Sequence, residues 1–149
     1  MPWFVRDIET VCEYVCLCDP AVDRKAMTPE QVHSYERSPS PASLPLLDGM
    51  EPHTFRVHAI STDEVVRLRS EMIAAVGPAP PDEDPDLDAK QAARAGRSLI
   101  AAWNHDVSIV KAGLVDCPDS LSNWPESVVE ELAGVIRSLS SGDTVLRGN

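Results

Sequence analysis

Apolar and polar side chains alternate over residues 54–60, and a capped helical repeat follows at once. Alternation with a period of two predicts a half-buried antiparallel strand, in which Phe55 and Val57 face the core. Residues 11–18 are rich in strand-forming side chains and stop at Asp19-Pro20, so they are the expected partner strand. The pattern therefore predicts a small antiparallel sheet of about two to three strands.

A helix is predicted directly after the second strand. Ser61 stands at the cap position and Glu64 follows three residues later, as in a capping box. Gly77-Pro78 then supplies a left-handed cap and a stop signal. Between these signals the apolar residues recur at helical spacing: Val65, Leu68, Met72 and Val76.

Two more helices are predicted in the C-terminal half. The first runs from about Leu87 to Leu114, and its polar Asn104-His105-Asp106 segment favours a bend near residue 104. Its apolar face carries Leu99, Trp103, Val107, Val110 and Leu114. The last helix begins near Asn123-Trp124-Pro125-Glu126, which combines a cap residue, a proline and an early acid, and it ends at Ser141-Gly142. Its stripe is the most continuous in the chain: Val128, Val129, Leu132, Val135, Ile136 and Leu139.

Several segments lack a regular pattern. Residues 38–53 contain several prolines and are interpreted as an irregular loop, or as an arm that becomes ordered against a partner. Upstream, Thr28-Pro29 favours a single helical turn. Residues 78–88 form an acidic, proline-rich linker, and residues 143–149 form a flexible tail. We therefore predict one domain over residues 1–149, of the α+β class, with about three helices packed on the sheet.

Acidic side chains outnumber basic ones, 24 against 13, which gives a formal net charge of −11. Such a surface repels phosphate groups, so binding to nucleic acid or to anionic lipid is not expected. No apolar run approaches the length of a membrane span. The first residues, Met1–Asp7, lack the basic and apolar regions of a signal peptide. These features favour a protein of a reducing cytoplasm.

Three of the four cysteines lie close together, at Cys12, Cys16 and Cys18, and Cys117 is distant. The spacing C-x3-C-x-C does not match the paired spacings of zinc knuckles. On a strand the three thiols would share one face, as a row of small apolar side chains also would. Buried free thiols are the favoured interpretation, with a metal site or a disulfide as alternatives. We assign no metal ligand from the sequence.

No motif for a phosphate-binding loop, a dinucleotide site, a nucleophilic serine or a metal-binding helix is present in the sequence. The four histidines are His33, His53, His58 and His105, and no two of them lie four residues apart. The Asn104-His105-Asp106 segment is a candidate acid–base pair, but surface polarity or a helix break explains it better. We therefore expect no catalytic, cofactor-binding or metal-binding residues, and no enzymatic activity.

Two parts of the sequence carry a resemblance to a known family. The first runs from Glu13-Tyr14-Val15 to Asp19-Pro20-Ala21 and continues at residues 54–61. The second begins with Ala112-Gly113-Leu114-Val115 and continues over residues 124–133 and 136–140. Together they resemble small proteins from the head–tail gene cluster of long-tailed bacteriophages, which are regarded as tail-assembly or tail-assembly-chaperone-like proteins. The chain departs from that pattern at Trp124, where leucine is usual, and at Ala59, where proline is common.

The resemblance implies a non-enzymatic bacteriophage morphogenesis protein that binds the tail tube, the tape-measure protein or a head–tail connector. Alternatives are a structural component retained in the virion and a small anti-host protein-binding factor. The implied location is the host cytoplasm, or the virion for a retained component, and the oligomeric state stays open. We expect partner contacts at a strand face, at the proline-rich arm and at two tryptophans: Tyr14, Cys16, Cys18, Leu44, Leu46, Trp103 and Trp124.

Overall fold

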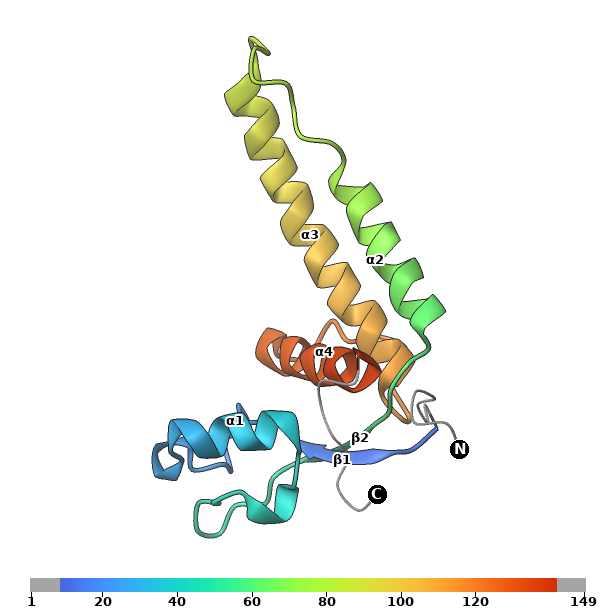
Figure 1. The fold of residues 1–149 in the computed structure, drawn as a ribbon. Helices are drawn as coiled ribbons and strands as arrows, with labels where there is room; N and C mark the ends of the chain where they lie inside the picture. Colours follow the sequence, from blue (N-terminus) through green and yellow to red (C-terminus); the bar gives the residue numbers. More distant parts are fainter. Residues whose placement is uncertain (1–8, 142–149) are drawn as a thin grey trace.

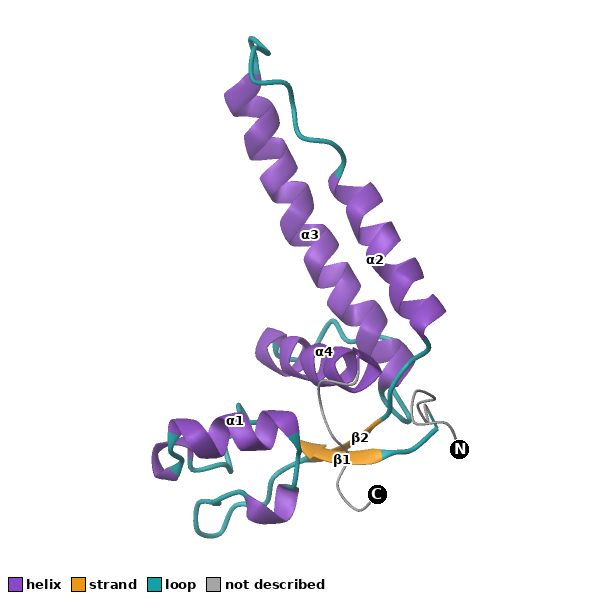
Figure 2. Cartoon of the chain, viewed as in Figure 1, coloured by secondary structure: helices purple, strands orange, loops and turns teal. Residues whose placement is uncertain are grey.

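The computed structural model describes residues 9–141, which contain a two-stranded sheet and four α-helices (Figure 1, Figure 2). In chain order the elements are β1 (Cys12–Val15), the 3-10 helix η1 (Arg24–Ala26), α1 (Pro29–Arg37), the 3-10 helix η2 (Pro41–Ser43), β2 (Thr54–Val57), α2 (Thr62–Val76), α3 (Leu87–Gly113) and α4 (Glu126–Ser141). The predicted α+β class is confirmed. The described part has four α-helices, however, instead of about three.

The additional helix is α1, where the sequence predicted a single turn. Its N-terminus carries a complete capping box, because the Gln31 amide donates to the Thr28 hydroxyl and the Thr28 amide donates to the Gln31 side chain. One aromatic side chain, Tyr35, is buried and anchors the helix to the sheet. The helix therefore forms with little apolar periodicity of its own, which explains why the pattern did not predict its length.

The two strands pair antiparallel, as predicted, with Cys12 opposite Val57 and Val15 opposite Thr54. Both are shorter than expected. At the end of β1 the chain turns, and the Asp19 amide donates to the Cys16 carbonyl at 3.0 Å. Beside β2, the segment after α3 extends the pairing, because Val115 N donates to the Arg56 carbonyl at 2.9 Å.

The core forms where α4 meets the sheet and the end of α3. Figure 1 shows α4 lying across the lower end of α3, above the strands. The predicted stripe of α4 is confirmed as its buried face, with Val129, Leu132 and Ile136 fully buried. These side chains pack with Val57 of β2 and Ile109 of α3 in one hydrophobic cluster.

Helices α2 and α3 form a hairpin that projects from this core (Figure 1). The boundaries of α2 and the start of α3 agree with the sequence prediction. The predicted bend near residue 104 is absent, since α3 is one continuous helix of 27 residues, about 40 Å long. The polar segment Asn104-His105-Asp106 fits into the helix because its side chains face α2, α4 or solvent. Asp106, for example, pairs with Arg137 of α4.

The upper half of α3 has only the end of α2 and the linker of residues 78–88 beside it, so part of its apolar face is not covered. Leu99, which the sequence placed on the apolar face of this helix, is 75% exposed, and the neighbouring Ile100 is 64% exposed. In α2 only Leu68 of the predicted stripe is fully buried. The periodicity therefore identified the helices and their apolar faces correctly, and the structure leaves part of these faces exposed in the hairpin.

The irregular segments have distinct roles. Residues 38–53 are held against the segment before α1, because Leu47 N donates to the Ala21 carbonyl and Asp23 N donates to the Pro45 carbonyl. Residues 78–88 join α2 to α3 at the far end of the hairpin, and their last two residues begin α3. The predicted tail, 143–149, lies outside the described residues. None of the described helices combines the length and the hydropathy that a membrane span requires.

Candidate functional site

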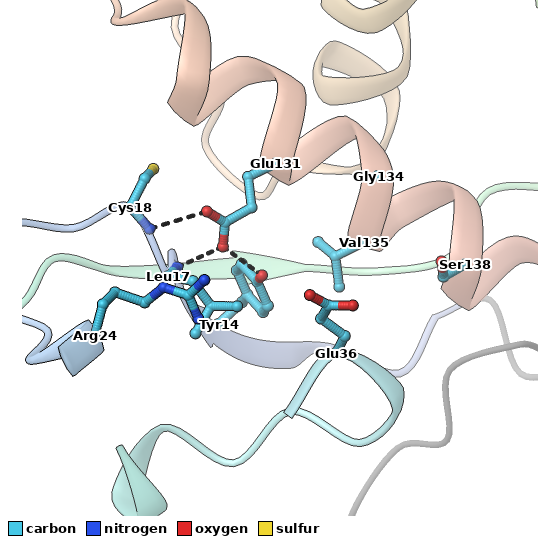
Figure 3. Close-up of a pocket in the computed structure, with 9 residues that line it drawn as sticks. All are labelled: Tyr14, Leu17, Cys18, Arg24, Glu36, Glu131, Gly134, Val135 and Ser138. Carbon is cyan, nitrogen blue, oxygen red and sulfur yellow. Dashed lines mark hydrogen bonds between the residues drawn. The ribbon is translucent and has the colours of Figure 1, made fainter. Parts of the chain in front are cut away.

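A half-buried acid, Glu131 of α4, organises the pocket at the end of β1 (Figure 3). Its Oε2 accepts hydrogen bonds from the Tyr14 hydroxyl and from the Leu17 amide, each at 2.5 Å. Its Oε1 accepts a third from the Cys18 amide at 3.1 Å. The turn after β1 thus points two backbone N–H groups at one carboxylate, which fixes the turn against α4.

Tyr35 of α1 supports the same turn from the other side. Its hydroxyl donates to the Val15 carbonyl at 2.6 Å and accepts from the Val15 amide at 3.0 Å. Its ring lies 5.4 Å from the ring of Tyr14, centroid to centroid. Helices α1 and α4 therefore hold the end of β1 between them.

Burial dominates the proton equilibria of this region. Burial, and secondarily the Glu131 carboxylate, raises the pKa of the Tyr14 hydroxyl and of the Cys16 thiol above their usual ranges. The same two causes raise the pKa of the Cys18 thiol. Both thiols are therefore protonated near neutral pH in the free protein, so neither is an activated nucleophile.

Two of the clustered cysteines meet this acid. The Cys16 Sγ, the Cys18 Sγ and a carboxylate oxygen of Glu131 all lie within 4.8 Å of one another. Cys12, which the sequence grouped with them on one strand face, is not part of this set, since four residues of an extended strand separate it from Cys16 by about 13 Å.

No functional role was assigned to Glu131 from the sequence, and its central position was missed. A signal was present. Glu131 lies three residues after Val128 and four before Val135, so it falls on the apolar face of α4. An acid on an apolar helix face requires polar partners, and here the turn after β1 supplies them.

The pocket beside Glu131 has a volume of about 580 Å³. Figure 3 shows Arg24 and Glu36 reaching toward it from the segments around α1, and Ser138 from α4. Its lining mixes both signs of charge with an aromatic ring and with the aliphatic side chains of Leu17 and Val135.

The residues predicted to contact partners separate into two groups. Tyr14, Cys16 and Leu44 are 2%, 1% and 7% exposed, so their assignment as contacts is corrected: these apolar side chains fill the core. Leu46 is 44% exposed and Cys18 is exposed as well.

The two tryptophans that were predicted as contacts are half-buried and pack against the core. The Trp124 ring lies 5.7 Å from that of Phe55, centroid to centroid. Trp103 lies on α3, at the level where exposed apolar surface begins.

A second surface feature follows the seam between α2 and α3. A hollow of about 930 Å³ at the outer end is lined by Ile73 and Leu99, of which Ile73 is 63% exposed. A hollow of about 920 Å³ continues toward α4, and the two share Met72 and Ala102. We call this continuous surface the hairpin groove. Its remaining apolar lining residues include Val65, Val66, Val76, Ala79 and Ala95.

The charges of the hairpin groove differ from those of the whole molecule. Three arginines line it, Arg69, Arg94 and Arg137, against two acids, Asp82 and Asp106. Arg137 and Asp106 form an ion pair at 2.6 Å, and the Arg94 Nε donates to the Gly77 carbonyl at 3.2 Å. These five charged residues, which we call the rim of the hairpin groove, therefore carry a small net positive charge in a chain of net charge −11.

Comparisons of the chain with protein-family models, with curated proteins and with solved structures gave no match.

Proposed function

We propose that this chain is a non-enzymatic bacteriophage morphogenesis protein, which binds a tail or head–tail protein through the hairpin groove. The phage context comes from the resemblance of residues 13–21, 54–61, 112–115, 124–133 and 136–140 to small tail-assembly proteins. The surface comes from the structure. The partner in this proposal is an amphipathic helix of a tail tube, tape-measure or connector protein, whose apolar face lies along the seam between α2 and α3.

The observation that carries the proposal is where the exposed apolar side chains lie. Eight large hydrophobic side chains are exposed among residues 9–141, and four of them are on the hairpin: Val66, Ile73, Leu99 and Ile100. Three of these, Val66, Ile73 and Leu99, line the hairpin groove. Isolated exposed hydrophobic residues are ordinary, but a cluster along a groove between two helices is typical of a docking surface. A third helix placed in this seam would complete a three-helix bundle and bury Ile73 and Leu99.

The charges of the rim favour a particular partner helix. Arg69 and Arg94 flank the apolar strip, so acidic residues beside the apolar face of the partner are complementary. The rest of the chain is strongly acidic and repels an acidic partner. This repulsion favours the one orientation in which the acidic residues of the partner face the arginines of the groove.

The loop of residues 46–50 offers a smaller second contact. Leu46, Leu47 and Met50 are exposed there, while Leu44 anchors the loop in the core. This arrangement supports the role of the proline-rich arm as a contact segment, with Leu46 as its predicted residue.

Co-purification tests this proposal. The tagged chain is coexpressed with the tail tube, tape-measure and connector proteins of the same gene cluster, and we expect one of them to be recovered with it. The double variant Ile73→Ser/Leu99→Ser should reduce that recovery at least about tenfold, since central apolar contacts carry most of the binding energy. Val11→Ser removes an exposed apolar side chain outside the groove and should have no effect.

Two results would count against the proposal: no phage protein recovered, or equal recovery with the double variant and with Val11→Ser. Circular dichroism of the variants controls for folding, because the replaced side chains are exposed. Mass spectrometry of purified particles then separates an assembly factor, which is absent from the particle, from a component retained in the virion. Recovery of a bacterial protein through the same groove would instead favour the anti-host alternative.

A further inference from the structure

The clustered thiols beside Glu131 have a use that the proposed function does not require. Cys16 and Cys18 flank the tip of the turn after β1, and Glu131 reaches them from α4, 113 residues away in sequence from Cys18. The three potential ligand atoms lie within 4.8 Å of one another. In a tetrahedral zinc site, ligand atoms are about 3.5–3.8 Å apart, given zinc–sulfur bonds of about 2.3 Å. A contraction of about 1 Å therefore suffices to bring them around one ion.

We propose that Cys16, Cys18 and Glu131 form a binding site for a single zinc-class divalent ion, which joins the end of β1 to α4. Two sulfur ligands and one carboxylate favour zinc over magnesium or calcium, which prefer oxygen ligands only. The fourth position faces the adjacent pocket and takes a water molecule. On binding, each thiol gives its proton to solvent and the sulfur donates an electron pair to the metal.

The position of Glu131 is already fixed for this role. Tyr14 and the Leu17 amide hold Oε2, and the Cys18 amide holds Oε1 by one bond only. A carboxylate oxygen has two lone pairs, so Oε1 keeps one for a metal. Hydrogen bonds that orient a ligand in advance are a regular property of protein metal sites. The Cys18 Sγ lies within 4.8 Å of a carboxylate oxygen of Glu131, so both groups are in place before an ion binds.

The two cysteines occupy different environments, which makes the proposal testable by substitution. Cys16 is buried, and its replacement risks the fold, whereas Cys18 is exposed. Cys117 is half-buried and lies outside the cluster, so Cys117→Ser is a matched control for the loss of one thiol.

The test is a titration of the full chain with Co²⁺ and then Zn²⁺, after treatment with a chelator and with a phosphine reductant. We expect one Co²⁺ per chain, with the sulfur-to-cobalt charge-transfer band and the intense visible bands of a tetrahedral thiolate site, both abolished when Zn²⁺ displaces Co²⁺. Cys18→Ser should weaken binding at least about tenfold and diminish the charge-transfer band. Cys117→Ser should behave as the unsubstituted chain does.

Thermal unfolding gives a second readout. Because the ion joins two distant segments of the folded chain, a hundredfold excess of Zn²⁺ over its dissociation constant should raise Tm by about 5–10 °C. The proposal is overturned if no charge-transfer band appears, if Cys117→Ser reduces it as much as Cys18→Ser does, or if bound Zn²⁺ leaves Tm unchanged.

Discussion

Glu131 accepts three hydrogen bonds from a segment more than a hundred residues away in sequence, and these bonds connect the sheet to α4. Two of the donors are backbone amides, which no other described side chain satisfies. A carboxylate is the appropriate group here because it accepts at both oxygens and donates at neither. At the scale of single residues, the junction between β1 and α4 therefore depends on this one side chain.

Glu131→Gln tests that dependence. The glutamine amide can accept at one position only, and its NH2 group faces an amide donor, so the free energy of unfolding should fall by about 1–3 kcal/mol. Urea denaturation measures the change. Glu130→Gln, the exposed neighbour on the same helix, is the control and should change stability little. Equal effects of the two variants would contradict the role of Glu131.

The buried hydroxyl of Tyr35 should make the free energy of unfolding depend on pH. Burial raises the pKa of its hydroxyl above the usual range, and this outweighs the opposite effect of the Val15 amide. In the unfolded chain the hydroxyl ionises at about pH 10. The hydroxyl therefore contributes fully to the free energy of unfolding below that pH, and this contribution is lost as the pH rises through and beyond it.

The measurement is the slope of unfolding free energy against pH between about 9 and 11, obtained from urea denaturation at each pH. The free energy should decrease over this range, and the decrease should be smaller for Tyr35→Phe, whatever the baseline stability of the variant. A slope unchanged by Tyr35→Phe would show that the hydroxyl ionises as easily in the folded chain as in the unfolded one.

Among the helices, α3 and α4 approach each other closely where they cross. Gly113 ends α3 against Ile136 of α4, and a Cβ added there would lie 2.5 Å from Ile136 Cγ2 and 3.0 Å from the His58 carbonyl oxygen. The His58 amide also donates to the Gly113 carbonyl at 2.9 Å, so the backbone at this position is held by β2 as well. The absence of a side chain at residue 113 therefore sets how closely α3, α4 and the sheet approach.

Gly113→Ala should destabilise the chain by about 1–3 kcal/mol, because Ile136 or the backbone must move. Gly96→Ala on the same helix is the matched control. A Cβ at residue 96 meets no atom within 4 Å, so the higher helix propensity of alanine should stabilise the chain by about 0.5–1 kcal/mol. Thermal denaturation should place the two Tm values on opposite sides of that of the parent chain; shifts in the same direction would contradict the close crossing.

The elements show which parts of the fold were predictable. The starts of α2 and α3 and the stripe of α4 were predicted correctly because caps, linkers and apolar repeats are local signals. The exposure of Leu99 was not, since periodicity identifies an apolar face and says nothing about what covers it. The cluster of Cys16, Cys18 and Glu131 was equally hidden, because it forms only when the chain returns to β1 from the other end of the sequence.

The whole molecule combines a compact core with a projecting hairpin. The core uses α4, the sheet and the lower end of α3, and it buries the apolar stripe that the sequence predicts most clearly. The hairpin leaves Ile73 and Leu99 exposed along its groove, and a basic rim crosses an otherwise acidic chain. This division gives a stable body and a separate surface for a partner, which is the arrangement that a binding protein of the proposed kind requires.

Amide hydrogen exchange of the full chain, with and without the co-purified phage protein, tests the central claim most directly. Binding in the hairpin groove should slow exchange in residues 66–76 and 91–102, while the core around Val129 and Ile136, already protected, should change little. A complex that leaves both hairpin segments exchanging as in the free chain would contradict the account.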